Sequence, residues 1–162
     1  MTFQDCIPIV LDLEGGYTND ALDKGGETNF GIAKQFYPKE DIKKMTKKRA
    51  TDIYKKDYWD AMGVEKLPSH LKLIVFDCGV NCGIKTAVIL LQDVAGVLRD
   101  GQIGRITVAA CREISVSTYA KRRVLYYKRI VKKNPTQAKF LEGWLNRVKI
   151  VEAKSKASQK IM

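Results

Sequence analysis

Residues 3–32 read FQDCIPIVLDLEGGYTNDALDKGGETNFGI, and this stretch decides how the fold begins. Its first part carries apolar residues at helical spacing, which predicts an amphipathic helix. Because proline is harmless only in the first turn of a helix, Pro8 indicates that the helix begins, or bends, near Asp5. The pair Gly15-Gly16 is a usual helix end. The glycine, asparagine and aspartate residues that follow predict turns or a short β-hairpin.

Nearly every later segment repeats apolar residues at helical spacing, and few segments resemble strands. Thr46 and Thr107 are expected to cap helices, and Pro68 suits the start of another. The predicted helices lie around Phe30–Tyr37, Thr46–Trp59, Leu71–Val80, Ile84–Leu98, Ser117–Lys133 and Thr136–Ser158. We therefore predict a mainly α protein with a short β-hairpin or irregular loop after the first helix.

The chain offers one plausible internal boundary, the turn at Asp100–Ile106. This turn separates a region at residues 1–98 from a helical region at residues 99–162. Hydrophobic residues make up 45% of the 162 residues, which is enough for a real core. We expect the two regions to pack together as one compact unit.

The charge is strongly positive, with 29 lysine and arginine residues against 18 aspartate and glutamate residues and a formal net charge of +11. A surplus of this size exceeds the ~2–8 that solubility requires and favours polyanionic partners. Nucleic acid and the bacterial envelope both fit, and a role in solubility alone is the alternative. The sequence has no helix-turn-helix or finger pattern, so we do not expect it to bind nucleic acid.

The four cysteines, Cys6, Cys78, Cys82 and Cys111, form no C-x-x-C pair, and His70 is the single histidine. This composition predicts no metal site and indicates buried thiols from a reducing compartment, although a disulfide stays open. The first fifteen residues lack the basic start of a secretory signal, and no apolar run is long enough to span a bilayer. We expect a soluble monomer, made in the cytoplasm, that needs separate delivery if its substrate lies outside.

Glu14 is the residue whose chemistry is clearest. It is expected at the C-terminal end of the first helix, where the helix dipole favours a protonated acid. Apolar neighbours such as Leu13 and Tyr17 act in the same direction. A carboxylic acid that keeps its proton near neutral pH can serve as a general acid. An ordinary surface glutamate at a helix end is the alternative.

Asp23 and Thr28 follow Glu14 within the same glycine-rich region. Glycosidases generally use two carboxyl groups, of which one protonates the leaving oxygen and the other activates water or stabilises the sugar cation. A hydroxyl such as that of Thr28 can help to hold the water. Both residues can also serve only as turn and cap residues, and these structural roles do not exclude catalysis.

A longer ordered set of residues extends this pattern. It comprises Glu14-Gly15-Gly16-Tyr17, Asn19-Asp20, Asp23, Gly25-Gly26, Thr28-Asn29 and Gly31-Ile32, then Tyr58-Trp59-Asp60, Phe76-Asp77 with Val80-Asn81, Leu91-Gln92, Asp100-Gly101 with Ile103-Gly104, Arg123 with Tyr126-Tyr127, and Phe140 with Gly143-Trp144 and Arg147. The set covers nearly the whole chain and resembles the glycoside hydrolase 108 family of N-acetylmuramidases, which are often phage endolysins or prophage lysis proteins. The last third resembles the predicted peptidoglycan-binding region of that family.

The resemblance implies a lysozyme-like fold that cleaves the β-1,4 bond between N-acetylmuramic acid and N-acetylglucosamine in peptidoglycan, with no cofactor and no metal. Glu14 matches the essential catalytic glutamate, and Asp23 and Thr28 match positions expected to line the cleft. Their spacing is close to the Glu–Asp–Thr triad of phage-type lysozymes, which has one more residue before the threonine. The resemblance also implies release through a separate membrane pore, with action at the cell wall or periplasm.

Two other functions remain as alternatives. One is a lytic transglycosylase that uses Glu14 alone, and the other is a non-catalytic wall-binding protein on the same scaffold. We assign substrate contacts to Tyr17, Asn29 and Asn81, although Asn81 either reaches an N-acetyl group or forms a hydrogen bond inside the core. The basic helices after Lys121 also fit contact with an anionic membrane, but an apolar stripe that faces the core suits their periodicity better.

Overall fold

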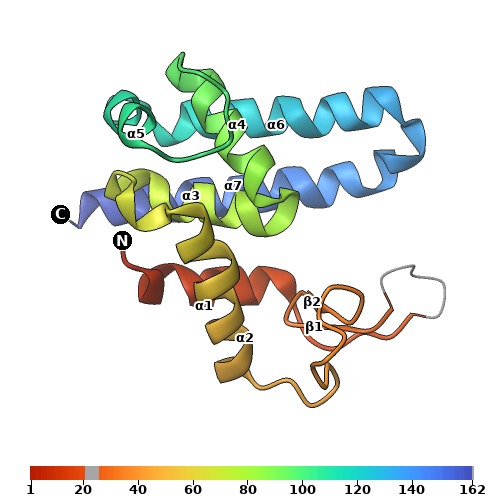
Figure 1. The fold of residues 1–162 in the computed structure, drawn as a ribbon. Coiled ribbons are helices and arrows are strands. Elements are labelled where there is room, and N and C mark those ends of the chain that lie inside the picture. The colour runs from red at the N-terminus through yellow and green to blue at the C-terminus, as the bar shows by residue number, and fades with distance from the viewer. Residues whose placement is uncertain (21–25, 162) are drawn as a thin grey trace.

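The computed structural model describes residues 1–20 and 26–161 and shows a predominantly helical protein (Figure 1). Its α-helices are α1 (Phe3–Glu14), α2 (Lys47–Tyr54), α3 (Ser69–Cys82), α4 (Ile84–Ala95), α5 (Arg105–Cys111), α6 (Val116–Lys133) and α7 (Ala138–Lys160). Strands β1 (Thr28–Asn29) and β2 (Ile32–Ala33) form an antiparallel hairpin. Shorter helical segments cover Lys55–Asp60, Val64–Lys66 and Pro135–Gln137. The prediction of a mainly α protein with a hairpin after the first helix is confirmed.

Helix α1 begins at Phe3, earlier than predicted. A capping box explains this start: the Thr2 side chain accepts a hydrogen bond from the Asp5 amide, and the Asp5 carboxylate accepts one from the Thr2 amide. Pro8 therefore lies inside the helix. The helix ends at Glu14, where Gly15 takes a φ of 80° and turns the chain away.

The hairpin replaces the helix expected around Phe30–Tyr37, so that prediction was wrong. Thr28 pairs with Ala33, and two residues with positive φ join the strands: Phe30 at 52° and Gly31 at 77°. A two-residue hairpin loop of this kind matches the right-handed twist of the strands. Phe30 in this conformation carries a strain of about 1–3 kcal/mol, which the surrounding contacts must offset.

Helix α3 forms the centre of the core, and α1, α4, α6 and α7 pack against it. Its buried apolar side chains include Leu71, Leu73, Ile74, Val75, Phe76 and Cys78. Within this core, Phe3, Trp59 and Phe76 form an edge-to-face aromatic cluster with centroids 5.2–5.9 Å apart. Trp59 is thus a core residue.

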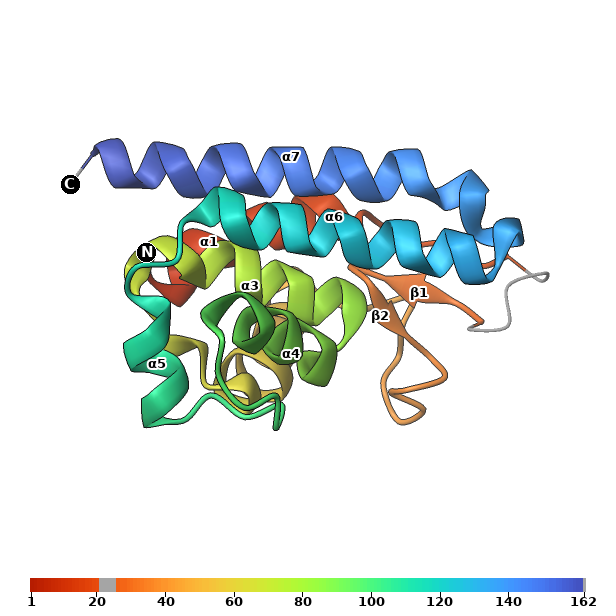
Figure 2. The ribbon, with the colours of Figure 1, turned by 90° about the horizontal axis from the view of Figure 1, so that it is seen from above.

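Helices α6 and α7 lie side by side along one face of the molecule (Figure 2). Both pack on α3, so residues 99–162 and residues 1–98 share one core. Helix α5 begins after Gly104, and Thr107 lies inside it, so the predicted cap was wrong. The buried Thr107 hydroxyl instead accepts a hydrogen bond from Gln92 at 3.1 Å. Among the described helices, none has both the length and the apolar character needed to cross a membrane.

Candidate active site

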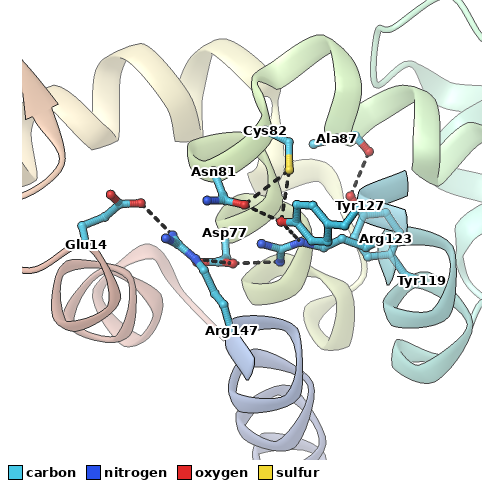
Figure 3. Close-up of polar contacts among 9 residues, drawn as sticks. All are labelled: Glu14, Asp77, Asn81, Cys82, Ala87, Tyr119, Arg123, Tyr127 and Arg147. Atoms are coloured by element: carbon cyan, nitrogen blue, oxygen red, sulfur yellow. Dashed lines mark hydrogen bonds and ion pairs between the residues drawn. The ribbon is translucent and has the colours of Figure 1, made fainter. Parts of the chain in front are cut away.

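Glu14 lies at the C-terminal end of α1 and against the hairpin turn at Gly31, with its side chain 17% exposed. Its carboxylate oxygen Oε1 accepts a hydrogen bond of 2.7 Å from Nη2 of Arg147 on α7 (Figure 3). This contact joins residues 133 positions apart in the sequence. The sequence placed apolar residues, Asp23 and Thr28 near Glu14, and the structure adds a guanidinium group that was not predicted.

Asp77 of α3 binds Arg147 from the opposite side. Its Oδ1 accepts hydrogen bonds from Arg147 Nη2 at 2.8 Å and from Nε at 3.1 Å. Burial opposes the charge of Arg147, but the two neighbouring carboxylates still raise its pKa. Arg147 therefore stays charged while it bridges Asp77 and Glu14.

A second guanidinium group, that of Arg123, contacts the other oxygen of Asp77. Arg123 of α6 forms an ion pair of 2.8 Å with Asp77 Oδ2, and both side chains are fully buried. Arg123 Nε also donates to the Tyr127 hydroxyl at 3.0 Å. Removing one partner from such a buried pair typically costs about 3–5 kcal/mol, because the other charge is left uncompensated. We call Arg123, Asp77, Arg147 and Glu14 the charge row.

The other oxygen of Glu14 faces the turn of the hairpin. A Cβ atom on Gly31 would overlap Glu14 Oε2 and would lie 2.6 Å from the Tyr54 hydroxyl, so only glycine fits there. The Tyr54 hydroxyl donates to the Phe30 carbonyl oxygen at 2.7 Å and thereby supports the strained turn. Burial and the charge of Glu14 raise the pKa of Tyr54 and of Tyr58, which keeps both hydroxyls protonated.

Two predicted site residues, Tyr17 and Thr28, lie in or beside the hairpin. Thr28 exchanges backbone hydrogen bonds of 2.8 Å with Thr18, and the two hydroxyl oxygens are 2.7 Å apart. The Tyr17 ring is exposed, and its hydroxyl donates to the Glu27 carboxylate at 2.8 Å. Asp23, the predicted second carboxylate, lies outside the described residues.

The two predicted asparagines are both engaged in hydrogen bonds within the protein. Asn29 is buried, and its Nδ2 donates to the Ile42 carbonyl oxygen at 3.0 Å, which ties the hairpin to the loop that follows. Asn81 lies on α3 and accepts a hydrogen bond from the Tyr127 hydroxyl. Both amides support the framework around Glu14, and their assignment as substrate contacts stays a prediction.

The four cysteines are free in the structure. Burial raises the pKa of Cys6 to about 12 and that of Cys111 to about 11. Cys82 is half-buried, and hydrogen bonding with Cys78 and with the Tyr127 hydroxyl lowers its pKa to about 7. Burial raises the pKa of Cys78 itself. Of the four thiols, only that of Cys82 has its pKa lowered by its surroundings.

Arg147, Tyr54 and Gly31 were not predicted as site residues. Arg147 is one of 29 basic residues, and no local pattern singles it out. Tyr54 falls on the buried face of α2 and has the spacing of a core residue. Gly31 gave a usable signal, because it directly precedes the apolar Ile32 in the glycine-rich region that the sequence had already linked to function.

Comparison with known proteins places this geometry in a family. The model of the family described as glycosyl hydrolase 108 matches residues 7–83, and a predicted peptidoglycan domain matches residues 86–149. The solved structure of SagA from Brucella abortus is 32% identical, with a TM-score of 0.82 over 96% of this chain and 94% of that chain. The chain belongs to the glycosyl hydrolase 108 family.

This glycosyl hydrolase 108 protein is therefore a glycosidase that degrades peptidoglycan. The search of curated proteins found no match. Glu14 falls in the segment matched by the hydrolase model, and Arg147 falls in the segment matched by the peptidoglycan domain. The contact between them links the two matched segments.

Gly31→Ala tests the approach of the hairpin to Glu14. The added Cβ displaces the Glu14 carboxylate, so we expect at least a roughly 10²-fold loss of peptidoglycan-clearing activity. The positive φ adds about 1–2 kcal/mol of destabilisation, measured by urea unfolding. Gly26→Ala is the matched control, because Gly26 also has a positive φ, of 72°, but its Cβ would meet nothing within 4 Å. Equal activity losses in the two variants would contradict the contact.

Alkylation with iodoacetamide tests the thiol assignment. The thiolate is the reactive form, so Cys82 should be labelled first at pH 7. Its labelling rate should rise with pH through about 7 and level off above that value. Peptide mapping by mass spectrometry follows each cysteine, and Cys82→Ser should abolish the fast phase. Labelling of Cys6 or Cys111 ahead of Cys82 would refute the assignment.

Proposed function

We propose that this protein hydrolyses the β-1,4 bond between N-acetylmuramic acid and N-acetylglucosamine, with Glu14 as the general acid. The observation that carries the proposal is the way Glu14 is held. Arg147 binds one carboxylate oxygen at 2.7 Å, and the other oxygen faces the hairpin turn at Gly31. A general acid needs a fixed orientation as well as a proton.

The arrangement separates the tasks of the two Glu14 oxygens. In the protonated acid, Oε1 continues to accept the hydrogen bond from Arg147 while Oε2 carries the proton. Oε2 gives this proton to the glycosidic oxygen as the bond to the anomeric carbon breaks and its electron pair moves to the leaving oxygen. Arg147 is compatible with this role because its Nη2 donates to Oε1 in either protonation state of the carboxyl group, which leaves Oε2 for the proton.

Hydrolysis also requires a group that activates water or stabilises the sugar cation. Asp77 is fully buried between two guanidinium groups and is excluded from that role by its position. We assign the role to Asp23 of the glycine-rich loop, with Thr28 helping to hold the water. The water oxygen then bonds to the anomeric carbon, and the proton that the water loses passes to the Asp23 carboxylate.

The biological role that we propose is that of an endolysin of a phage or prophage, acting at the wall of the host cell. The net charge of +11 suits a polymer that carries carboxylate and phosphate groups. One chain supplies both Glu14 and its ion-pair partner, so the proposed mechanism requires no second subunit.

Glu14→Gln removes the transferable proton and preserves the size of the side chain. We expect turbidity clearing of purified peptidoglycan to fall by about 10²–10⁴-fold. Asp12→Asn is the matched control, because Asp12 is an exposed carboxylate on the same helix, and this variant should keep its activity. Unchanged clearing by Glu14→Gln would refute the assignment of the acid.

Mass analysis of the wild-type fragments tests the reaction type in the same experiment. Hydrolysis adds one water and leaves a reducing N-acetylmuramic acid end. A lytic transglycosylase leaves an anhydro ring, lower in mass by one water. Anhydro products, together with full activity of Asp23→Asn, would replace the hydrolase proposal with the transglycosylase.

A further inference from the structure

Arg147 lies in the segment matched as a peptidoglycan domain, yet its side chain contacts the proposed acid. We infer that Arg147 is a positioning residue for Glu14, so that the C-terminal region is an integral part of the catalytic site and not a separable binding module. This inference rests on the proposed role of Glu14. It assigns to α7 a task in the chemical step, beyond any contact with the polymer.

The backbone of α7 is held in place by packing that does not involve the Arg147 side chain. Val148, Val151 and Ser155 on the same helix are buried, and α7 packs against both α3 and α6. The Arg147 side chain is only 11% exposed. Its guanidinium therefore has a defined position relative to the end of α1, where Glu14 stands.

Asp77 fixes the orientation of the guanidinium plane. Arg147 donates to Asp77 through two nitrogens: Nε contacts Oδ1 at 3.1 Å and Oδ2 at 3.2 Å, and Nη2 contacts Oδ1 at 2.8 Å. Contacts through two nitrogens restrict the rotation of the guanidinium plane. Nη2 carries a second hydrogen, and Nη2 lies 2.7 Å from Glu14 Oε1. Arg123 holds Asp77 from behind at 2.8 Å. Figure 3 shows the four side chains next to one another in space, in the order Arg123, Asp77, Arg147 and Glu14.

The consequence concerns the rotation of the Glu14 carboxyl group. A glutamate side chain has several rotatable bonds and, without a partner, samples many orientations. The bond from Arg147 fixes Oε1, and the absence of a side chain at Gly31 leaves room for Oε2 against the hairpin. Oε2 is thus the proton-donating atom in every turnover.

A purely structural ion pair would place the same groups together, so the test must separate positioning from folding. We would measure kcat and KM on soluble glycan fragments for Arg147→Ala, Arg147→Lys and the control Lys149→Ala. Lys149 is exposed on the same helix and carries the same charge. Circular dichroism and thermal melting report the folding of each full-length variant.

We expect Arg147→Ala to lower kcat by about 10²-fold, the effect of misplacing a reacting group, and to change KM by no more than about twofold. Added ethylguanidinium, at concentrations far below those that denature proteins, should restore part of kcat. Arg147→Lys should lose about tenfold, because a single ammonium lacks the planar fork that serves Asp77 and Glu14 together. Lys149→Ala should keep the wild-type kcat.

Wild-type kcat in Arg147→Ala, or a loss confined to KM and equal to that of Lys149→Ala, would overturn the inference. If Arg147→Ala does not fold, Arg147→Lys decides, and wild-type kcat in that variant would overturn it. Glu14→Gln separates this failure from that of the proposed function. If Glu14→Gln is active, both the general-acid role of Glu14 and the positioning role of Arg147 are refuted. If Glu14→Gln is inactive and Arg147→Ala is fully active, only the positioning role is refuted.

Discussion

The fully buried carboxylate of Asp77, set between the guanidinium groups of Arg123 and Arg147, is the interaction on which the site depends. Taking these charges out of water is costly, and only their mutual pairing and the defined geometry make it tolerable. The three residues come from α3, α6 and α7, so the helices must pack together for the charges to meet. Arg147 in turn contacts Glu14 at the end of α1, and this contact completes the charge row.

This dependence links the stability of the fold to its chemistry. Helix α3 supplies Asp77 from the centre of the core, and the apolar packing around it excludes the water that would weaken the ion pairs. On the other side of Glu14, the hairpin brings Gly31 against Oε2, and Tyr54 supports the Phe30 carbonyl in the strained turn. Glu14 is therefore held between a rigid helical framework and a tight turn.

The sequence predicted the local features well. Helical spacing and the two glycines located the end of α1 at Glu14. The predicted ranges Ser117–Lys133 and Thr136–Ser158 located the break between the two long C-terminal helices. The helix expected around Phe30–Tyr37 was wrong, because positive φ at Phe30 and Gly31 closes a hairpin there instead. Local spacing cannot reveal such a turn when its first residue is an aromatic.

The long-range contacts of the site could not be predicted from the sequence. Arg147 meets Glu14 across 133 positions, and nothing near either residue signals the other. Resemblance to the glycosyl hydrolase 108 family included Arg147 and Asp77 among its landmarks but gave them no role. Their pairing follows from the packing of α7 on α3, which is set by apolar side chains elsewhere along both helices.

A crystal structure of Glu14→Gln with a bound peptidoglycan glycan chain would test the central claim most directly. The account predicts that the scissile glycosidic oxygen lies within about 3 Å of the side-chain atom that faces Gly31, while Arg147 keeps its contact with the other side-chain atom. A glycan chain bound away from residue 14, or a residue 14 side chain turned from the hairpin with Arg147 paired only to Asp77, would contradict it.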